Sequence, residues 1–116
     1  MKKRYHVPAH ELRELVPDSG SCIASDLILV DGHRIGFMYR EVPDLDHDSG
    51  WRFFAGVESQ DYVDEAANFA FYAINTVANY DEDIIPLLGS PVGSAFERDE
   101  SGAFVAVPFP VDPESN

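Results

Sequence analysis

The sequence has a single cysteine, few basic residues and no long apolar run. Because Cys22 is the only cysteine among 116 residues, no internal disulfide can form, which is typical of a protein in the reducing cytoplasm. Cys22 lies within an apolar run, so we expect a small buried side chain there rather than a catalytic nucleophile. A chain of this length needs neither a metal nor a disulfide for stability, because it buries about two thirds of its unfolded surface on folding.

Basic residues are scarce throughout the chain. Only 8 lysines and arginines stand against 21 aspartates and glutamates, which gives a formal net charge of −13. A chain this acidic repels nucleic-acid phosphates and anionic membrane surfaces, so we expect neither nucleic acid nor a membrane as a partner. Its electric field favours a basic partner or a cation, although an acidic surface also serves solubility alone.

Long apolar segments are also missing. The N-terminus is basic but lacks the apolar core of a signal peptide, and no apolar run approaches the roughly 20 residues of a membrane span. We therefore expect a soluble cytoplasmic protein. The chain is 45% hydrophobic and 12% aromatic, as is typical of a globular domain. We divide it into an N-terminal arm with a short helix at 1–20, one globular domain at 21–107 and a flexible tail at 108–116.

Two pairs of β-rich stretches predict two hairpins. The stretches 22–30 and 33–42 flank an Asp-Gly pair at 31–32, and such a pair between strands is typical of a two-residue hairpin turn. A second hairpin is predicted within 94–109, around the sequence Glu-Ser-Gly. Between the hairpins, the sequence WRFFAGV at 51–57 predicts a further strand.

Short helices are predicted in three places. Residues 9–17 carry apolar side chains three and four apart, which predicts one or two helical turns. An acidic connector at 58–68 precedes a segment that favours a helix at 72–79, while 69–72 fits a helix or a strand. Residues 81–89 predict a short helix with Asp83 as its N-cap. Strands, then helices, then strands indicate an α+β domain with a mainly antiparallel sheet of about five strands and two or three short helices.

Three acids at alternate positions precede the aromatic stretch and raise the question of a calcium site. Asp44, Asp46 and Asp48 occupy the first, third and fifth positions of a register like that of an EF-hand. That motif requires glycine at the sixth position and a bidentate glutamate at the twelfth. Because Ser49 and Ala55 stand there instead, we predict no dedicated calcium site and no cofactor.

No sequence motif for nucleophilic, phosphate or zinc chemistry is present. The chain has no G-x-S-x-G, no P-loop lysine and no H-E-x-x-H. Its 21 acids guarantee some close carboxylate pairs, so clustered acids are a weak signal for acid–base catalysis. We therefore predict no enzyme, no catalytic residue and no metal. The alternative is a protein that binds a small ligand or a divalent cation, or a hydrolytic enzyme that uses clustered carboxylates.

Two arginines and one tryptophan on predicted strands have more than one interpretation. We expect the guanidinium groups of Arg40 and Arg52 to pair with nearby acids at the edge of the sheet, with capture of an anion or a partner as the alternative. The strand spacing of Trp51 favours a core position. An exposed Trp51 beside the acidic loop at 42–50 would instead anchor an interface.

Four stretches carry a family resemblance: SCIASDLILVDG, IGFMYRE, DSGWRFFAGVES and INTVANYDEDIIPLLGSPVGSAFERDESGAF. Over roughly residues 21–107, they resemble a bacterial family of domains of unknown function that is grouped with the predicted immunity proteins of the immunity protein 33-like type. The resemblance implies a role in neutralising a toxin by binding it, and it implies no particular catalytic or binding residues. An acidic face suits toxins that are basic, such as nucleases.

These observations predict a small protein-binding domain of the immunity type. Its partner would be a basic protein toxin or another protein. The predicted binding face is an acidic rim around an aromatic anchor. It comprises Asp44, Asp46, Asp48, Trp51, Glu58, Asp61 and Asp64.

Overall fold

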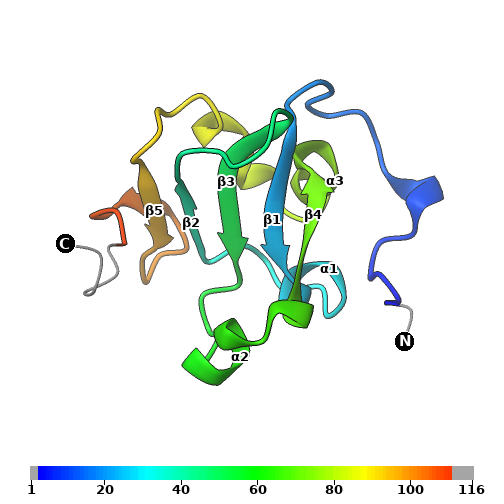
Figure 1. Ribbon diagram of the computed structural model, residues 1–116, viewed down its shortest axis with the longest axis horizontal. Helices are drawn as coiled ribbons and strands as arrows, with labels where there is room; N and C mark the ends of the chain where they lie inside the picture. Colours follow the sequence, from blue (N-terminus) through cyan, green and yellow to red (C-terminus); the bar gives the residue numbers. More distant parts are fainter. Residues whose placement is uncertain (1–2, 111–116) are drawn as a thin grey trace.

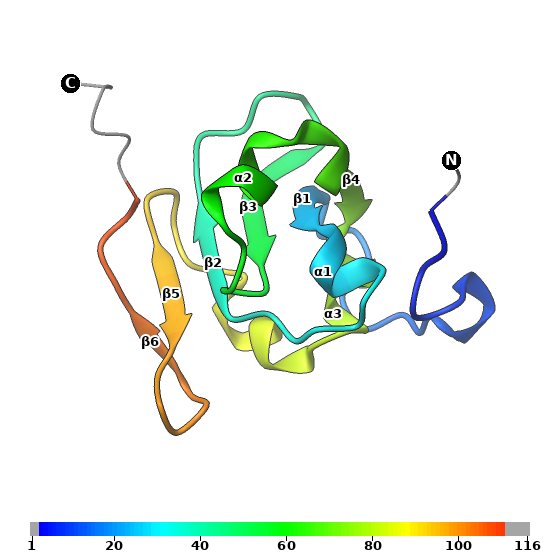
Figure 2. The same ribbon diagram turned by 90° about the horizontal axis from the view of Figure 1, so that it is seen from below.

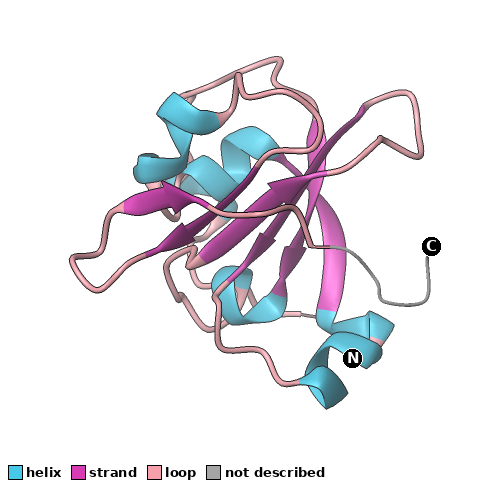
Figure 3. Ribbon diagram, turned by 90° about the vertical axis from the view of Figure 1, so that its left-hand side faces the viewer, coloured by secondary structure: helices cyan, strands magenta, loops and turns pink. Residues whose placement is uncertain are grey.

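The computed structural model describes residues 3–110, which form a six-stranded mixed sheet with short helices on both of its faces (Figures 1 and 3). The strands are β1 (Ser21–Ser25), β2 (Phe37–Arg40), β3 (Asp48–Phe54), β4 (Phe69–Ala73), β5 (Ala95–Arg98) and β6 (Phe104–Ala106). They follow the order β4-β1-β3-β2-β5-β6 across the sheet. Among these pairs only β1 and β3 are parallel. The predicted α+β class with a mainly antiparallel sheet is therefore confirmed, with six strands instead of about five.

The helices are all short. Three are α-helices, α1 (Asp26–Leu29), α2 (Gln60–Asp64) and α3 (Ile74–Ala78), and three are 3-10 helices, η1 (Ala9–Glu11), η2 (Ala66–Asn68) and η3 (Glu82–Leu87). Side-chain caps set where several of them begin, because an oxygen of the preceding residue accepts a backbone N–H of the first turn. Ser25 and Ser59 cap α1 and α2 in this way. Within residues 3–110, no helix has the length and apolar character to cross a membrane.

The first predicted hairpin is wrong. Strand β1 ends at Ser25, whose hydroxyl accepts the N–H of Leu27 and starts α1 where the prediction placed a strand. Gly32, with φ of +84°, then lets the chain turn out of the helix, and its N–H donates to the carbonyl of Ile28. The Asp-Gly pair thus ends a helical turn rather than linking two paired strands. β1 pairs with β3 and β4 instead.

The segment from 69 to 88 resolves the ambiguity between strand and helix. Phe69–Ala73 forms the edge strand β4, and α3 begins at Ile74, within the predicted range of 72–79. The next helix, η3, is capped by Asp81 rather than by Asp83: the Asp81 carboxylate accepts the N–H of Asp83. The hairpin of β5 and β6 is confirmed, with Glu97 opposite Val105.

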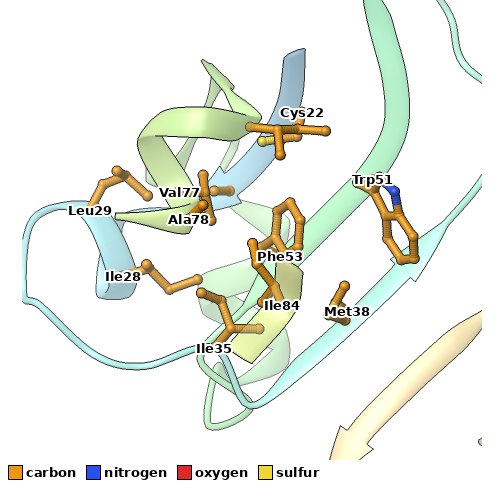
Figure 4. Packing of buried hydrophobic residues seen from close by; sticks show 12 residues of the cluster. Cys22, Ile28, Leu29, Ile35, Met38, Trp51, Phe53, Val77, Ala78 and Ile84 are labelled. Atoms are coloured by element: carbon orange, nitrogen blue, oxygen red, sulfur yellow. The ribbon is translucent and has the colours of Figure 1, made fainter. Parts of the chain in front are cut away.

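The core lies between the sheet and the layer of α1, α3 and η3 (Figure 4). Because alternate residues of a strand point to opposite faces, one set of side chains faces this layer. Met38, Trp51 and Phe53 from the sheet meet Val77 and Ile84 from the helical layer. Cys22 is fully buried in the same cluster, as expected. Figure 2 shows α2 on the other side of the sheet from α3 and η3.

The N-terminal arm packs against α3 in a mostly extended form. Only one turn of 3-10 helix, η1, forms there, because Leu12 already has an extended backbone. The side-chain oxygen of Asn75 accepts the N–H groups of Leu15 and Val16, and its amide donates to the carbonyl of Arg13. The predicted helix at 9–17 is thus reduced to a single turn by these contacts. Residues 111–116, most of the predicted flexible tail, lie outside the described residues.

Candidate functional site

Asp48, one of the three acids in the EF-hand-like register, is a buried structural residue. Both of its carboxylate oxygens accept hydrogen bonds of 2.8 Å from the Arg52 guanidinium. The same oxygens accept the N–H groups of Asp44 and Gly50. Because a carboxylate offers about four acceptor positions, none is left for a cation or for a partner. The Arg52 hydrogen bonds hold the pKa of Asp48 well below its usual range.

Arg52 pairs with nearby acids, as expected, although it lies on the interior strand β3 rather than at the edge of the sheet. It is 2% exposed and pairs with Glu41 as well as with Asp48. Arg40 behaves differently, since its guanidinium donates to the carbonyls of Ser49 and Ser90 and, within residues 3–110, pairs with no acid. Arg52 thus joins the start of β3 to Glu41, and Arg40 joins it to Ser90.

Trp51 occupies the core, so it cannot serve as the exposed anchor of the predicted binding face. Its side chain is 1% exposed, and its indole N–H donates to the carbonyl of Leu88. The ring of Phe53 stacks beside it at a centroid distance of 6.1 Å, and the guanidinium of Arg40 lies over it at 5.7 Å. The core interpretation of Trp51 is confirmed, and the anchor interpretation is wrong.

The remaining acids of the predicted face lie at the two ends of the sheet. Asp44 and Asp46 are exposed on the loop before β3, whereas Glu58, Asp61 and Asp64 follow β3 and lie on and around α2 (Figure 1). The seven residues of β3 separate the two groups by roughly 20 Å, at about 3.3 Å per residue. The structure therefore does not bring the predicted acids together in one rim.

An aromatic row that the sequence analysis did not single out lies on the face of the sheet opposite the core. The rings of Tyr39 and Phe54 stack at 5.8 Å with an interplanar angle of 15°, and Phe37 lies within 5.9 Å of both. The row continues through Phe109, which meets Tyr39 edge-on at 5.5 Å. On the other side, Phe54 meets Phe69 edge-on at 5.7 Å. Four segments distant in the sequence thus form one aromatic surface.

This surface forms the floor of an open groove. Strands β2 and β3 supply Phe37, Tyr39 and Phe54, while α2, β5 and the C-terminal segment provide the sides. The groove has a volume of about 1330 Å³, which exceeds the roughly 300–1,000 Å³ of typical small-molecule sites. Its size and open shape suit a segment of another protein better than an enclosed small molecule.

The charges along the groove are predominantly negative. Glu41, Glu58 and Glu97 line it together with one cation, Arg98. Arg98 is already paired with Asp81 and Asp83. Arg52 pairs in the same way with two acids, Asp48 and Glu41, and Glu41 is one of the three groove glutamates. Among the described residues, Glu58 and Glu97 have no ion-pair partner, so these two carboxylates carry the uncompensated negative charge of the groove.

Burial shifts the pKa of two groups, Tyr39 in the groove and Cys22 in the core. Burial raises the pKa of Tyr39, and the neighbouring charge of Glu41 raises it further. Burial also raises the pKa of the Cys22 thiol far above its usual range, so the thiol stays protonated and is a poor nucleophile. Within residues 3–110, no group of three or more His, Cys, Asp or Glu side chains has a geometry suited to a metal ion.

The comparison with protein families gives a match over most of the chain. The family model described as the immunity protein Imm33 domain matches residues 22–108. This span agrees with the resemblance inferred over 21–107, which is thereby confirmed. No curated protein and no solved structure matches the chain.

Proposed function

The chain belongs to the Imm33 immunity protein domain family, and from this premise we propose that it binds a protein toxin in the cytoplasm and thereby neutralises it. The role requires a surface that recognises another protein, and it requires no chemistry from this chain. Immunity by binding is also the role that the resemblance implied. We place the contact with the toxin at the aromatic groove over β2 and β3.

The aromatic row on the outer face of the sheet is the observation that carries this proposal. Aromatic side chains are enriched among the residues that dominate the binding energy of protein interfaces. Here Tyr39 and Phe54 lie at the floor of a groove, flanked by Val63, which is 40% exposed. Phe71 on the edge strand β4 extends the apolar surface and is 47% exposed. An exposed apolar surface of this kind marks an interaction site more often than an isolated exposed side chain does.

The charge of the chain supports a basic partner. With a net charge of −13, the protein attracts a basic toxin over long distances, and this attraction raises the association rate. The exposed acids at both ends of the sheet contribute to this field even though they do not form one rim. The net charge favours basic proteins as partners, while the groove provides the specific contacts.

Co-expression tests the proposal directly. A toxin encoded beside the gene of this protein should stop growth when expressed alone, and growth should resume when the two proteins are expressed together. The purified pair should co-elute in size-exclusion chromatography. Growth arrest that this protein does not relieve, together with the absence of a complex, would exclude the immunity role.

A matched pair of variants tests where the toxin binds. Val63→Arg places a bulky cation at the wall of the groove and should abolish both rescue and co-elution. Val92→Arg makes the same change at a residue of similar exposure, 49%, on a loop that does not line the groove. It should leave both readouts intact. Equal behaviour of the two variants would place the toxin contact elsewhere on the molecule.

A further inference from the structure

The groove combines aromatic rings with carboxylates, and we propose that it takes the side chain of an arginine from a basic partner protein. This inference rests on the proposed function only in taking the partner to be a protein. A guanidinium group is planar and weakly hydrated, so it stacks on aromatic rings and pairs with carboxylates at the same time. The groove presents both kinds of group along one surface.

The chain itself already packs arginines against aromatic rings. The guanidinium of Arg98 lies over the ring of Phe104 at 4.2 Å from its centroid, and that of Arg40 lies over Trp51 at 5.7 Å. Both distances fall within the range of cation–π attraction. The groove offers the same chemistry in the lining formed by Tyr39 and Phe54, and in the described residues no arginine of this chain lies over either of these rings.

Two carboxylates at the groove can pair with the charge of the incoming side chain. Glu97 is exposed, and among the described residues its carboxylate has no hydrogen-bond or ion-pair partner. Glu58 is held in place because its two oxygens accept the N–H groups of Ala55 and Gly56 at 2.7 and 2.9 Å. One glutamate is thus unengaged and the other is pre-oriented, which favours pairing with a guanidinium.

Two other occupants of the groove are disfavoured by charge. A second copy of this chain would bring another net charge of −13 against the same acidic surface. The chain's own terminal residues, 111–116, contain two acids and no base. Both would meet like charge at Glu58 and Glu97. A basic segment of another protein is the occupant that complements the groove.

The size of the groove supports a segment rather than an isolated side chain. Its volume of about 1330 Å³ is more than one arginine side chain needs, so residues flanking the arginine also find room. We expect the guanidinium to lie near Tyr39 and Glu97. The flanking residues would extend along β2 and β3 toward α2.

A peptide titration of the full-length protein tests this inference. The probe is a capped hexapeptide with the sequence Gly-Ser-Arg-Arg-Ser-Gly, and its control carries citrulline, which is neutral and nearly isosteric, at both arginine positions. The arginine peptide should shift the amide resonances of Tyr39, Phe54 and Gly56 in a saturable manner, and added salt should weaken its binding. The citrulline peptide should bind at least ~10-fold more weakly. Equal affinity of the two peptides, shifts outside the groove or the absence of saturable shifts would overturn the inference.

Variants of the groove provide a second arm. Glu97→Gln removes an exposed carboxylate that makes no contact within the described residues, and Phe109→Ala removes a ring near the end of the described chain. Each substitution should lower the affinity for the arginine peptide by about threefold or more. The matched control Glu100→Gln changes an exposed glutamate that does not line the groove, and it should bind like the unaltered protein. Unchanged affinity of both groove variants would overturn the inference.

The two proposals can fail separately. Rescue from the toxin that persists in Glu97→Gln and Phe109→Ala, in the absence of arginine-peptide binding, would overturn the arginine site and leave the immunity role standing. Specific binding of the arginine peptide without any toxin complex would do the reverse.

Discussion

Asp48 and Arg52, four residues apart on one strand, form a bidentate ion pair with two hydrogen bonds of 2.8 Å in the interior of the protein. The Asp48 side chain is fully buried, and that of Arg52 is 3% exposed. The pair joins the acidic loop to the sheet, because Asp48 also accepts the N–H of Asp44 in that loop. Its two ions compensate each other in a place where either one alone would be costly.

We expect Asp48→Asn to destabilise the protein by about 3 kcal/mol, because it leaves the buried Arg52 with a weaker partner. Glu41 still pairs with Arg52, so the loss should stay at the lower end of the range for a broken buried pair. Urea unfolding monitored by tryptophan fluorescence measures the change. Asp46→Asn, an exposed substitution on the same loop, should change the free energy of unfolding by less than about 0.5 kcal/mol. Similar losses in both variants would contradict the structural role of Asp48.

The same pair predicts a specific dependence on pH. The pKa of Asp48 is lowered in the folded protein, whereas an unfolded aspartate titrates near pH 3.9. A lowered pKa contributes stability that is fully present above pH ~4 and is lost as the pH falls toward the folded pKa. We therefore expect the stability difference between the unaltered protein and Asp48→Asn to be constant from pH ~7 to ~5 and to shrink between pH ~4 and ~2. Unfolding curves of both proteins across this range measure it, and a constant difference down to pH ~2 would refute the assignment.

Gly36→Ala should destabilise the floor of the groove. A Cβ atom at this position would lie 2.1 Å from the carbonyl oxygen of Ala55. The backbone cannot easily yield, because the N–H of Gly36 donates to Phe54 and its carbonyl accepts from Arg98. We expect a loss of about 3 kcal/mol from overpacking, measured by urea unfolding.

The control for this prediction is Gly89→Ala. A Cβ there meets no heavy atom within 4 Å, and its backbone is not in the left-handed region. This variant should be neutral or gain up to about 1 kcal/mol, because alanine restricts the unfolded chain. A Gly36→Ala protein as stable as Gly89→Ala would show that the Gly36–Ala55 contact leaves room for a methyl group.

Asn75→Ala should release the N-terminal arm from α3. The substitution leaves the N–H groups of Leu15 and Val16 without their acceptor and the carbonyl of Arg13 without one donor. We expect a loss of about 2 kcal/mol and faster hydrogen exchange at the amides of Leu15 and Val16. Asn68→Ala, which among the described residues removes an amide donating only to the carbonyl of Tyr62, should leave exchange in the arm unchanged. If the amides of Leu15 and Val16 stay protected in Asn75→Ala, Asn75 does not hold the arm in place.

Local sequence patterns predicted the elements that depend on neighbouring residues. The hairpin of β5 and β6 follows from alternation and turn residues, and so does the strand predicted at 51–57, although β3 begins three residues earlier, at Asp48, and ends at Phe54. The first hairpin failed because two local signals competed at the same place: Ser25 and Asp26 start a helix, while the Asp-Gly pair at 31–32 suits a turn between strands. The turn signal was correct, since Gly32 does change the chain direction, but a helical turn precedes it.

The functional roles of the acids could not be read from spacing. Asp44, Asp46 and Asp48 are equivalent in the sequence, yet only Asp48 points to a buried guanidinium. The role of Asp48 depends on Arg52 four residues later and on Glu41, which directly follows β2. The aromatic row was equally hidden, because Phe37, Tyr39 and Phe54 meet only when β2 and β3 pair.

The sequence by itself determined the class of this protein: an acidic α+β domain of the Imm33 family with a buried cysteine and no recognisable catalytic motif. Composition, periodicity and family motifs are properties of the chain, so they can be read along it. Tertiary structure alone decided that Trp51 is covered and that Phe109 reaches the ring of Tyr39. These outcomes depend on strand order and on which face of the sheet the helical layer covers. The groove exists because α3 and η3 pack on one face of the sheet and leave the aromatic rings of the other face open.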